Sequence, residues 1–224
     1  SDGTGAGLSL ATAAISGSSI LIDGGKSLQL SGSSTASGGA HTFNLGSTTN
    51  GTNILLFHGD TYASQHQIEV LGSDASDVAN ITFGDGTGTT TFAGAMDLSQ
   101  AAGNTVVVTM NGATLSGAII DNGNAADIDF AITGDSTISG TLDLAGTAAV
   151  VVITDSKTLT LSETATFGIG TITLGTAAAG GTLALTGNGK TLTAIIVGST
   201  GNAGKGDVTV SGTGTTTFAS EVGA

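Results

Sequence analysis

The chain lacks several residue types that a globular protein of its length normally contains. Its 224 residues include no Pro, Cys, Trp or Arg, and only four Lys. Average proline usage of about 5% would give roughly eleven. Proline cannot donate to a strand ladder and is excluded from central strands, so its absence favours a chain made almost entirely of strands. The 38 glycines supply the turns instead.

The missing cysteines and basic residues restrict the possible chemistry. Without cysteine there is no disulfide framework, so the protein belongs to a reducing compartment or is an extracellular protein stabilised in another way. Charged residues make up 9% and the net charge is −13, so the protein is acidic. No basic patch is available for phosphates or anionic lipids, and nucleic acid is therefore excluded as a partner. The longest apolar run, residues 148–153, is too short to span a bilayer, so membrane insertion is not expected either.

Short alternating segments recur along the whole chain. They are rich in β-branched residues and bounded by Gly, Asn, Asp or Ser, which is typical of strands. The predicted segments are 27–31, 42–46, 67–71, 80–84, 127–133, 158–162, 170–175, 181–186, 190–197 and 207–211. Three others, 54–57, 106–108 and 150–153, are apolar on both faces, which predicts burial on both sides or one wall of a dense core. The pattern predicts an all-β fold, a repetitive β-solenoid resembling a parallel β-helix, with one or two β-sandwiches as the alternative.

An internal repeat supports the solenoid. The octapeptide Gly-Thr-Gly-Thr-Thr-Thr-Phe-Ala occurs at 86–93 and again at 212–219. Further matches join 20–22 to 151–153, 26–31 to 157–162, 42–46 to 171–175 and 81–83 to 208–210. A shorter unit, an alternating strand followed by an apolar strand, opens at residues 8, 96 and 142. We therefore expect a single repetitive domain over 1–224, with degenerate halves at about 8–94 and 142–220 and a related segment, 95–141, between them.

These segments also resemble a known class of proteins. The octapeptide, with 157–162 and 181–187, is similar to large bacterial β-strand-repeat surface proteins and to autotransporter passengers of the filamentous-haemagglutinin kind. The resemblance implies a secreted β-rich scaffold without enzymatic activity.

One group of residues suggests calcium. Oxygen-bearing side chains gather at Asp121, Asn122, Asn124, Asp127 and Asp129. Asp74 with Asp77 forms a second cluster, and Asp85 lies between two glycines. Calcium takes six to eight oxygen ligands from flexible loops. The alternative is an Asx turn, in which the side chain bonds its own backbone. Calcium is thus the one possible cofactor.

Other candidate chemistry is weaker. His41, His58 and His66 lack the spacing of metal ligands and are expected to be solvated or to cap turns. Threonine pairs such as Thr158 and Thr160 are unevenly spaced, which disfavours ice binding. A polysaccharide-cleaving enzyme would need grouped carboxylates with a basic partner, and basic residues are scarce. We therefore expect no enzyme.

The sequence favours a structural role. We expect an extracellular or cell-surface protein whose partners are copies of itself, assembled by strand pairing or end-to-end stacking into a filament, sheath or surface layer. The residues expected to mediate assembly are Asp207, Val208, Val210, Thr216 and Phe218. The alternative is an adhesin or autotransporter stalk that binds a glycan or matrix protein. A carbohydrate-active or ice-binding solenoid ranks below both.

Overall fold

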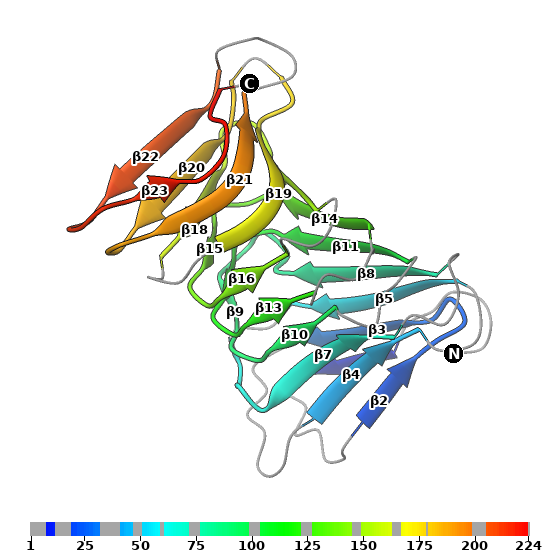
Figure 1. Ribbon diagram of the computed structural model, residues 1–224. Helices are drawn as coiled ribbons and strands as arrows, with labels where there is room; N and C mark the ends of the chain where they lie inside the picture. Colours follow the sequence, from blue (N-terminus) through cyan, green and yellow to red (C-terminus); the bar gives the residue numbers. More distant parts are fainter. Residues whose placement is uncertain are drawn as a thin grey trace.

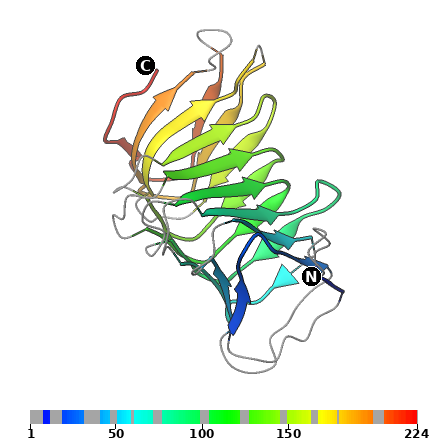
Figure 2. The same cartoon turned by 90° about the vertical axis from the view of Figure 1, so that its right-hand side faces the viewer.

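The protein is a parallel β-solenoid (Figure 1). The computed structural model describes residues 8–11, 19–31, 41–46, 51–58, 61–71, 77–98, 104–121, 127–144, 149–162, 167–177, 179–198 and 205–223. Strands of successive turns lie one above another from the N-terminal to the C-terminal end (Figure 2). Because the strand pairs in the described ranges are parallel, the expected solenoid is confirmed and the sandwich alternative is wrong. No helix in the described ranges is long and apolar enough to cross a membrane.

The chain winds around three faces. A 16-stranded path forms faces I and III, which meet at the long strand β19, and a seven-stranded sheet forms face II. Face I contains β1 (Leu8–Ala11), β3 (Ser27–Ser31), β5 (Thr52–Phe57), β8 (Val78–Phe83), β11 (Thr105–Met110), β14 (Asp127–Ile132), β17 (Val150–Ile153) and the C-terminal parts of β19 (Phe167–Leu174) and β21 (Thr191–Val197).

Faces II and III complete each turn. Face II contains β6 (Thr61–Tyr62), β9 (Thr90–Phe92), β12 (Ala113–Leu115), β15 (Ser136–Ile138), β18 (Thr158–Leu161), β20 (Thr182–Thr186) and β22 (Asp207–Ser211). Face III contains β2 (Ser19–Ile22), β4 (His41–Leu45), β7 (His66–Val70), β10 (Met96–Asp97), β13 (Ile119–Ile120), β16 (Leu142–Asp143), the N-terminal parts of β19 and β21, and β23 (Thr217–Phe218).

The alternating sequence pattern sets the core. In β3, for example, Leu28 and Leu30 point inward and are 4% and 1% exposed, whereas Gln29 points outward. Near the middle, Phe57 stacks on Phe83 with ring centroids 5.1 Å apart and meets Tyr62 edge-on at 4.8 Å. Burying one such side chain contributes about 1.5–3 kcal/mol, so the inward columns provide most of the stabilisation.

The strands that are apolar on both faces all belong to face I. Their inward residues are buried, but outward residues such as Ile54, Val107 and Val152 are only half-buried. These strands therefore form one wall of the core, the second of the two expected arrangements. The outer surface of face I is more apolar than that of a typical solvated sheet.

The turn length varies because the corners vary. Leu8 pairs with Leu28 and Thr61 with Thr91, so one turn takes 20 (28 − 8) to 30 (91 − 61) residues. Polar corner side chains join neighbouring turns. The Asp155 carboxylate accepts the N–H groups of Thr176 and Ala177 at 3.1 Å each. At other corners, the backbones of neighbouring turns approach so closely that a Cβ atom has no room, and glycine occupies these positions.

The sequence repeat does not follow the turns. From Thr91 on β9, the register passes through five partners, namely Thr114, Thr137, Thr160, Ala184 and Thr209. That path ends on β22, whereas the second octapeptide places its strand on β23, one face further along. The other matches behave alike, since β3 on face I matches β18 on face II and β8 on face I matches β22 on face II. The repeating sequence unit is therefore one strand with the corner that follows it, and this unit can occupy any of the three faces.

Candidate functional site

The C-terminal turn is the most unusual surface of the molecule. On β22, Val208 and Val210 stand in register with Leu183 and Leu185, whose side chains are 0% and 1% exposed. Among the described residues no further turn covers the valines, and Val210 is 54% exposed. Phe218 on β23 is half-buried. Side chains in core positions are therefore exposed or half-buried at this end of the described chain. They lie on β22 and β23, the last strands of their sheets (Figure 1).

The predicted assembly residues lie together on this end. Val208, Val210 and Phe218 occupy its inward positions. Asp207 is exposed at the start of β22, and Thr216 is half-buried just before β23. Another apolar residue, Val222, bridges to Ile196 on face I and is 50% exposed. Sequence reasoning missed Val222, because no alternating pattern surrounds it.

Face II bears an ordered column of hydroxyl groups. Thr61, Thr91, Thr114, Thr137 and Thr160 are register partners on successive strands, all at outward positions. The uneven threonine spacing in the sequence becomes an even spacing of about 4.8 Å between strands. Serines directly after the strands, including Ser139 and Ser162, form a parallel row. The uneven spacing that counts against ice binding in the sequence therefore carries no weight in the folded chain.

Face III contains a shallow acidic hollow. It has a volume of about 160 Å³ and is lined by Gln67, Ile68, Glu69, Ala95, Met96, Asp97 and Ile120. Glu69 and Asp97 are register partners, so their carboxylates are neighbours on adjacent strands. No basic side chain lines the hollow. The carboxylate pair is thus not joined there by the cationic partner expected of a polysaccharide-cleaving site.

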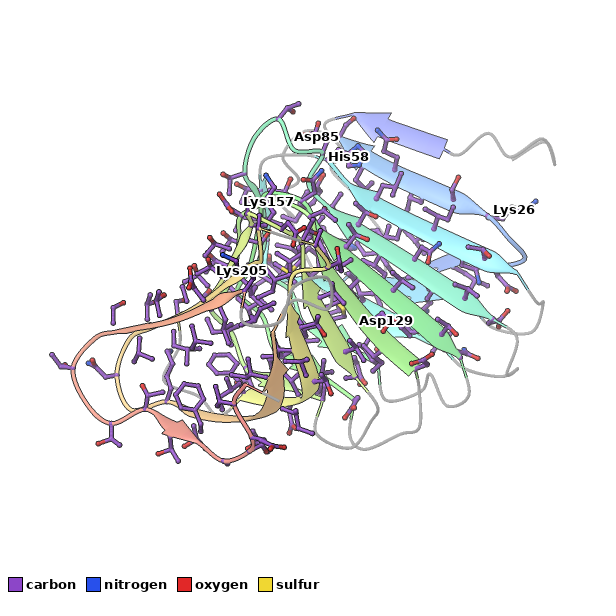
Figure 3. All side chains as sticks on the ribbon, turned by 90° about the horizontal axis from the view of Figure 1, so that it is seen from above. Lys26, His58, Asp85, Asp129, Lys157 and Lys205 are labelled. Carbon is purple, nitrogen blue, oxygen red and sulfur yellow. The ribbon has the colours of Figure 1, made fainter. Side chains whose placement is uncertain are left out.

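The predicted calcium residues that can be placed differ in burial. Asp121 is buried, Asp127 is exposed, and Asp129 is half-buried on the outer surface of face I (Figure 3). Burial raises the pKa of Asp129, and the neighbouring charge of Asp127 adds to the rise. Asn122, Asn124 and Asp74 lie outside the described residues. Within the described part of the chain, no three His, Asp or Glu side chains are grouped as metal ligands. Calcium at Asp121–Asp129 stays a prediction.

Asp85 follows the Asx-turn alternative. Its Oδ1 accepts the Thr87 hydroxyl at 2.6 Å and the Thr87 N–H at 2.9 Å. The side-chain hydrogen bond lowers the pKa of Asp85 most, and the backbone bond and the nearby His58 lower it further. His58 and Asp85 lie close together at one corner (Figure 3).

The other two histidines are buried, contrary to the expectation from the sequence. His41 and His66 are 3% and 0% exposed and are register partners, with ring centroids 5.6 Å apart. The expectation that they are solvated or cap turns is wrong. They lie at inward positions because each begins an alternating strand whose next inward residue is apolar, Phe43 or Ile68. The rings also pack near Phe43 and Tyr62, so they form part of the aromatic core.

A polar cluster in one corner was not foreseen as a unit. Asn53, Asp77 and Asn104 are all buried where the chain passes from face III to face I. Only Asp77 was singled out from the sequence, since an isolated Asn at the start of a strand is indistinguishable from an ordinary turn residue.

Comparison with known proteins identifies no relative: no protein-family model, curated protein or solved structure matches this chain.

Proposed function

We propose that this protein is a non-enzymatic structural component that assembles end to end with copies of itself. The product would be a fibre, sheath or surface layer outside the cell. The open C-terminal turn is the observation that carries the proposal, with Val210 at a core position and 54% exposed. Free strand edges next to apolar side chains favour pairing with another chain.

The matches within the chain support a second copy as the occupant. The last strands, β22 and β23, repeat the sequences of β8 and β9. Inside the fold, β8 and β9 are covered by β11 and β12. The final turn therefore has the sequence of an internal layer, and the N-terminal strand β2 has the apolar pattern of β11. Head-to-tail contacts that do not close into a ring produce filaments.

The composition agrees with an extracellular scaffold. Its polar surface is built of Thr, Ser and Asn, and only 9% of residues are charged. The small number of lysines would also limit cleavage by trypsin-like proteases.

The proposal is tested with Val210→Lys and a matched control, Thr209→Lys. Both add a charge to β22, but Val210 lies at an inward position and Thr209 at an outward one. We expect the wild-type chain and T209K to form regular polymers by negative-stain electron microscopy and sedimentation, and V210K to stay monomeric. Deleting residues 207–224 should also prevent assembly.

Two results would contradict the proposal. A wild-type chain that is monomeric at micromolar concentration would remove its basis. Particles that stop at two copies would indicate contact between two C-terminal ends instead of head-to-tail stacking.

The threonine column supports a second candidate, binding to ice. Parallel strands place the hydroxyl groups about 4.8 Å apart across strands, and after β12, β15 and β18 a serine lies roughly 6.6 Å further along the chain. Such a lattice could order water at an ice surface. Thr137→Lys at the centre of the column should abolish any inhibition of ice recrystallisation, whereas Thr141→Lys, at an exposed corner, should not. A wild-type chain without inhibition would eliminate this candidate.

A further inference from the structure

Three polar side chains are buried at one corner of successive turns. Asn53, Asp77 and Asn104 are 1%, 3% and 2% exposed. Asn53 is the second residue of β5, and the other two directly precede β8 and β11. Because β5, β8 and β11 are neighbours on face I, the three side chains lie in adjacent layers of the corner between faces III and I.

Each side chain uses one polar atom to hold the backbone. Asn53 Oδ1 accepts the Gly25 N–H, and Asp77 Oδ1 accepts the Gly51 N–H, both at 3.1 Å. Asn104 Nδ2 donates a long bond of 3.5 Å to the carbonyl oxygen of Leu71. These bonds fix the direction of each side chain and thus the position of its second polar atom.

The second polar atom of each side chain has no partner. Asp77 Oδ2, Asn104 Oδ1 and Asn53 Nδ2 are buried and form no hydrogen bond. Within the described ranges, no cationic side chain forms an ion pair with Asp77. A buried carboxylate without a compensating charge is strongly unfavourable, so a cation bound here would stabilise the site.

Gly46 shows that two of these atoms, Asp77 Oδ2 and Asn53 Nδ2, lie near one point together with the Leu71 carbonyl oxygen. A Cβ atom on Gly46 would lie 3.0 Å from the Leu71 carbonyl oxygen, 3.3 Å from Asp77 Oδ2 and 3.6 Å from Asn53 Nδ2. Asn104 joins the group through its bond to Leu71. The missing side chain of Gly46 therefore keeps the oxygens of Asp77 and Leu71 uncovered.

We propose that this corner binds a calcium ion. Its protein ligands are Asp77 Oδ2, Asn104 Oδ1 and the Leu71 carbonyl oxygen, and water completes the shell. Carboxylate, amide and main-chain oxygens are the donors that calcium accepts, in irregular geometry, whereas magnesium requires a near-ideal octahedron. The ion neutralises Asp77, and Asn53 Nδ2 donates to a water of the shell. With only one charged ligand the site is weak, with a dissociation constant on the order of 10⁻⁴–10⁻³ M.

This site shares Asp77 with the second acidic pair of the sequence, Asp74 and Asp77, uses none of the residues at Asp121–Asp129, and does not depend on self-assembly. Only Asp77 contributes a side-chain charge, and the other two ligands are neutral oxygens. A search for grouped acidic residues therefore does not find it.

The test measures thermal unfolding in EDTA and in millimolar calcium, together with calorimetric titration by calcium. Wild-type protein should bind one ion at this site and unfold about 1–5 °C higher with millimolar calcium. Asp77→Asn keeps an oxygen for the Gly51 N–H, so it should fold but lose the response. Asp143→Asn, which removes an exposed carboxylate on face III, is the matched control and should keep the response.

Asn104→Asp makes the test sharper, because it adds a negative ligand. It should destabilise the protein in EDTA and bind calcium roughly tenfold more tightly than wild type. If calcium changes neither the wild type nor N104D, the corner holds water instead and the proposal is wrong. A response that survives in D77N would equally overturn it.

Discussion

Phe92 and Phe218 occupy the same position in the two copies of the octapeptide, yet they lie on different faces of the solenoid. Phe92 is on β9 and pairs with Leu115 on face II, whereas Phe218 is on β23 and pairs with Leu192 on face III. Each of the longer sequence matches moves one face onward in the same way. The second half of the chain thus repeats the first with its faces rotated by one position.

This rotation predicts how two copies stack. Inside the fold, Ile81 on β8 pairs with Val108 on β11. If β2 of a second copy covers β22 in the corresponding register, Leu21 of that copy lies beside Asp207. Both positions are exposed.

The double variant Leu21→Cys, Asp207→Cys should therefore form covalent polymers on oxidation, visible on a denaturing gel. The chain has no native cysteine, so every disulfide must come from the engineered pair. Leu21→Cys with Ala219→Cys tests unrotated stacking, in which β2 follows β23 on face III. If only the variant with Leu21→Cys and Ala219→Cys cross-links, the chains do assemble end to end but the predicted rotation of the faces is wrong.

Gly117 should tolerate no side chain. A Cβ at this position would overlap the backbone carbonyl of Gly94 in the neighbouring turn, and backbone atoms cannot move aside as a flexible side chain can. We expect Gly117→Ala to lower the free energy of unfolding by about 2–3 kcal/mol, measured by urea denaturation. Gly88→Ala is the control, since nothing lies within 4 Å of its Cβ. Its effect should stay within about 0.5 kcal/mol, and equal effects of the two variants would refute this packing argument.

Phe57 should be the most sensitive position of the core. It contacts Phe43, Tyr62, Phe83 and Phe92 and is 0% exposed. Phe57→Ala should destabilise the protein by about 3–5 kcal/mol, because a large cavity remains between the turns. Leu56→Ala, the outward neighbour, should cost only about 1 kcal/mol. A similar loss for both variants would mean that the outward side of face I is buried as well.

The pH dependence of stability should contain a contribution from Asp129. Its folded-state pKa is raised by burial and by the charge of Asp127, so ionisation disfavours the folded chain. As the pH falls through this raised pKa toward the ordinary value of 3.8, the native state takes up its proton first and becomes more stable. Asp129→Asn should remove this part of the pH dependence and raise stability at neutral pH by about 0.5 kcal/mol. A variant that is less stable than wild type at neutral pH would show that the charge is favourable.

The strands were largely predictable and the turns of the solenoid were not. Segments 27–31 and 158–162 match β3 and β18 closely, because a half-buried strand imposes strict alternation on its sequence. The number of residues per turn could not be read from the sequence. The corners between strands differ in length, and strands with this alternating pattern can occupy any face. The octapeptide drew attention to β22 and β23, and their role in assembly stays a prediction.

The polar interior escaped prediction for a different reason. Nothing local distinguishes Asn53 or Asn104 from a turn residue, and His41 and His66 become neighbours only through strand register. Burial of a polar side chain depends on what the adjacent turn places above it. A single sequence without the register does not contain that information.

The direction of the strand ladders has a mechanical consequence. Hydrogen bonds between successive turns run along the long axis of the stack, so a pull on its two ends loads every layer in series. Each layer contacts only its neighbours, and the molecule should therefore extend by losing one turn after another at moderate force. A rod of this kind absorbs work gradually and can re-form each turn when the load is released.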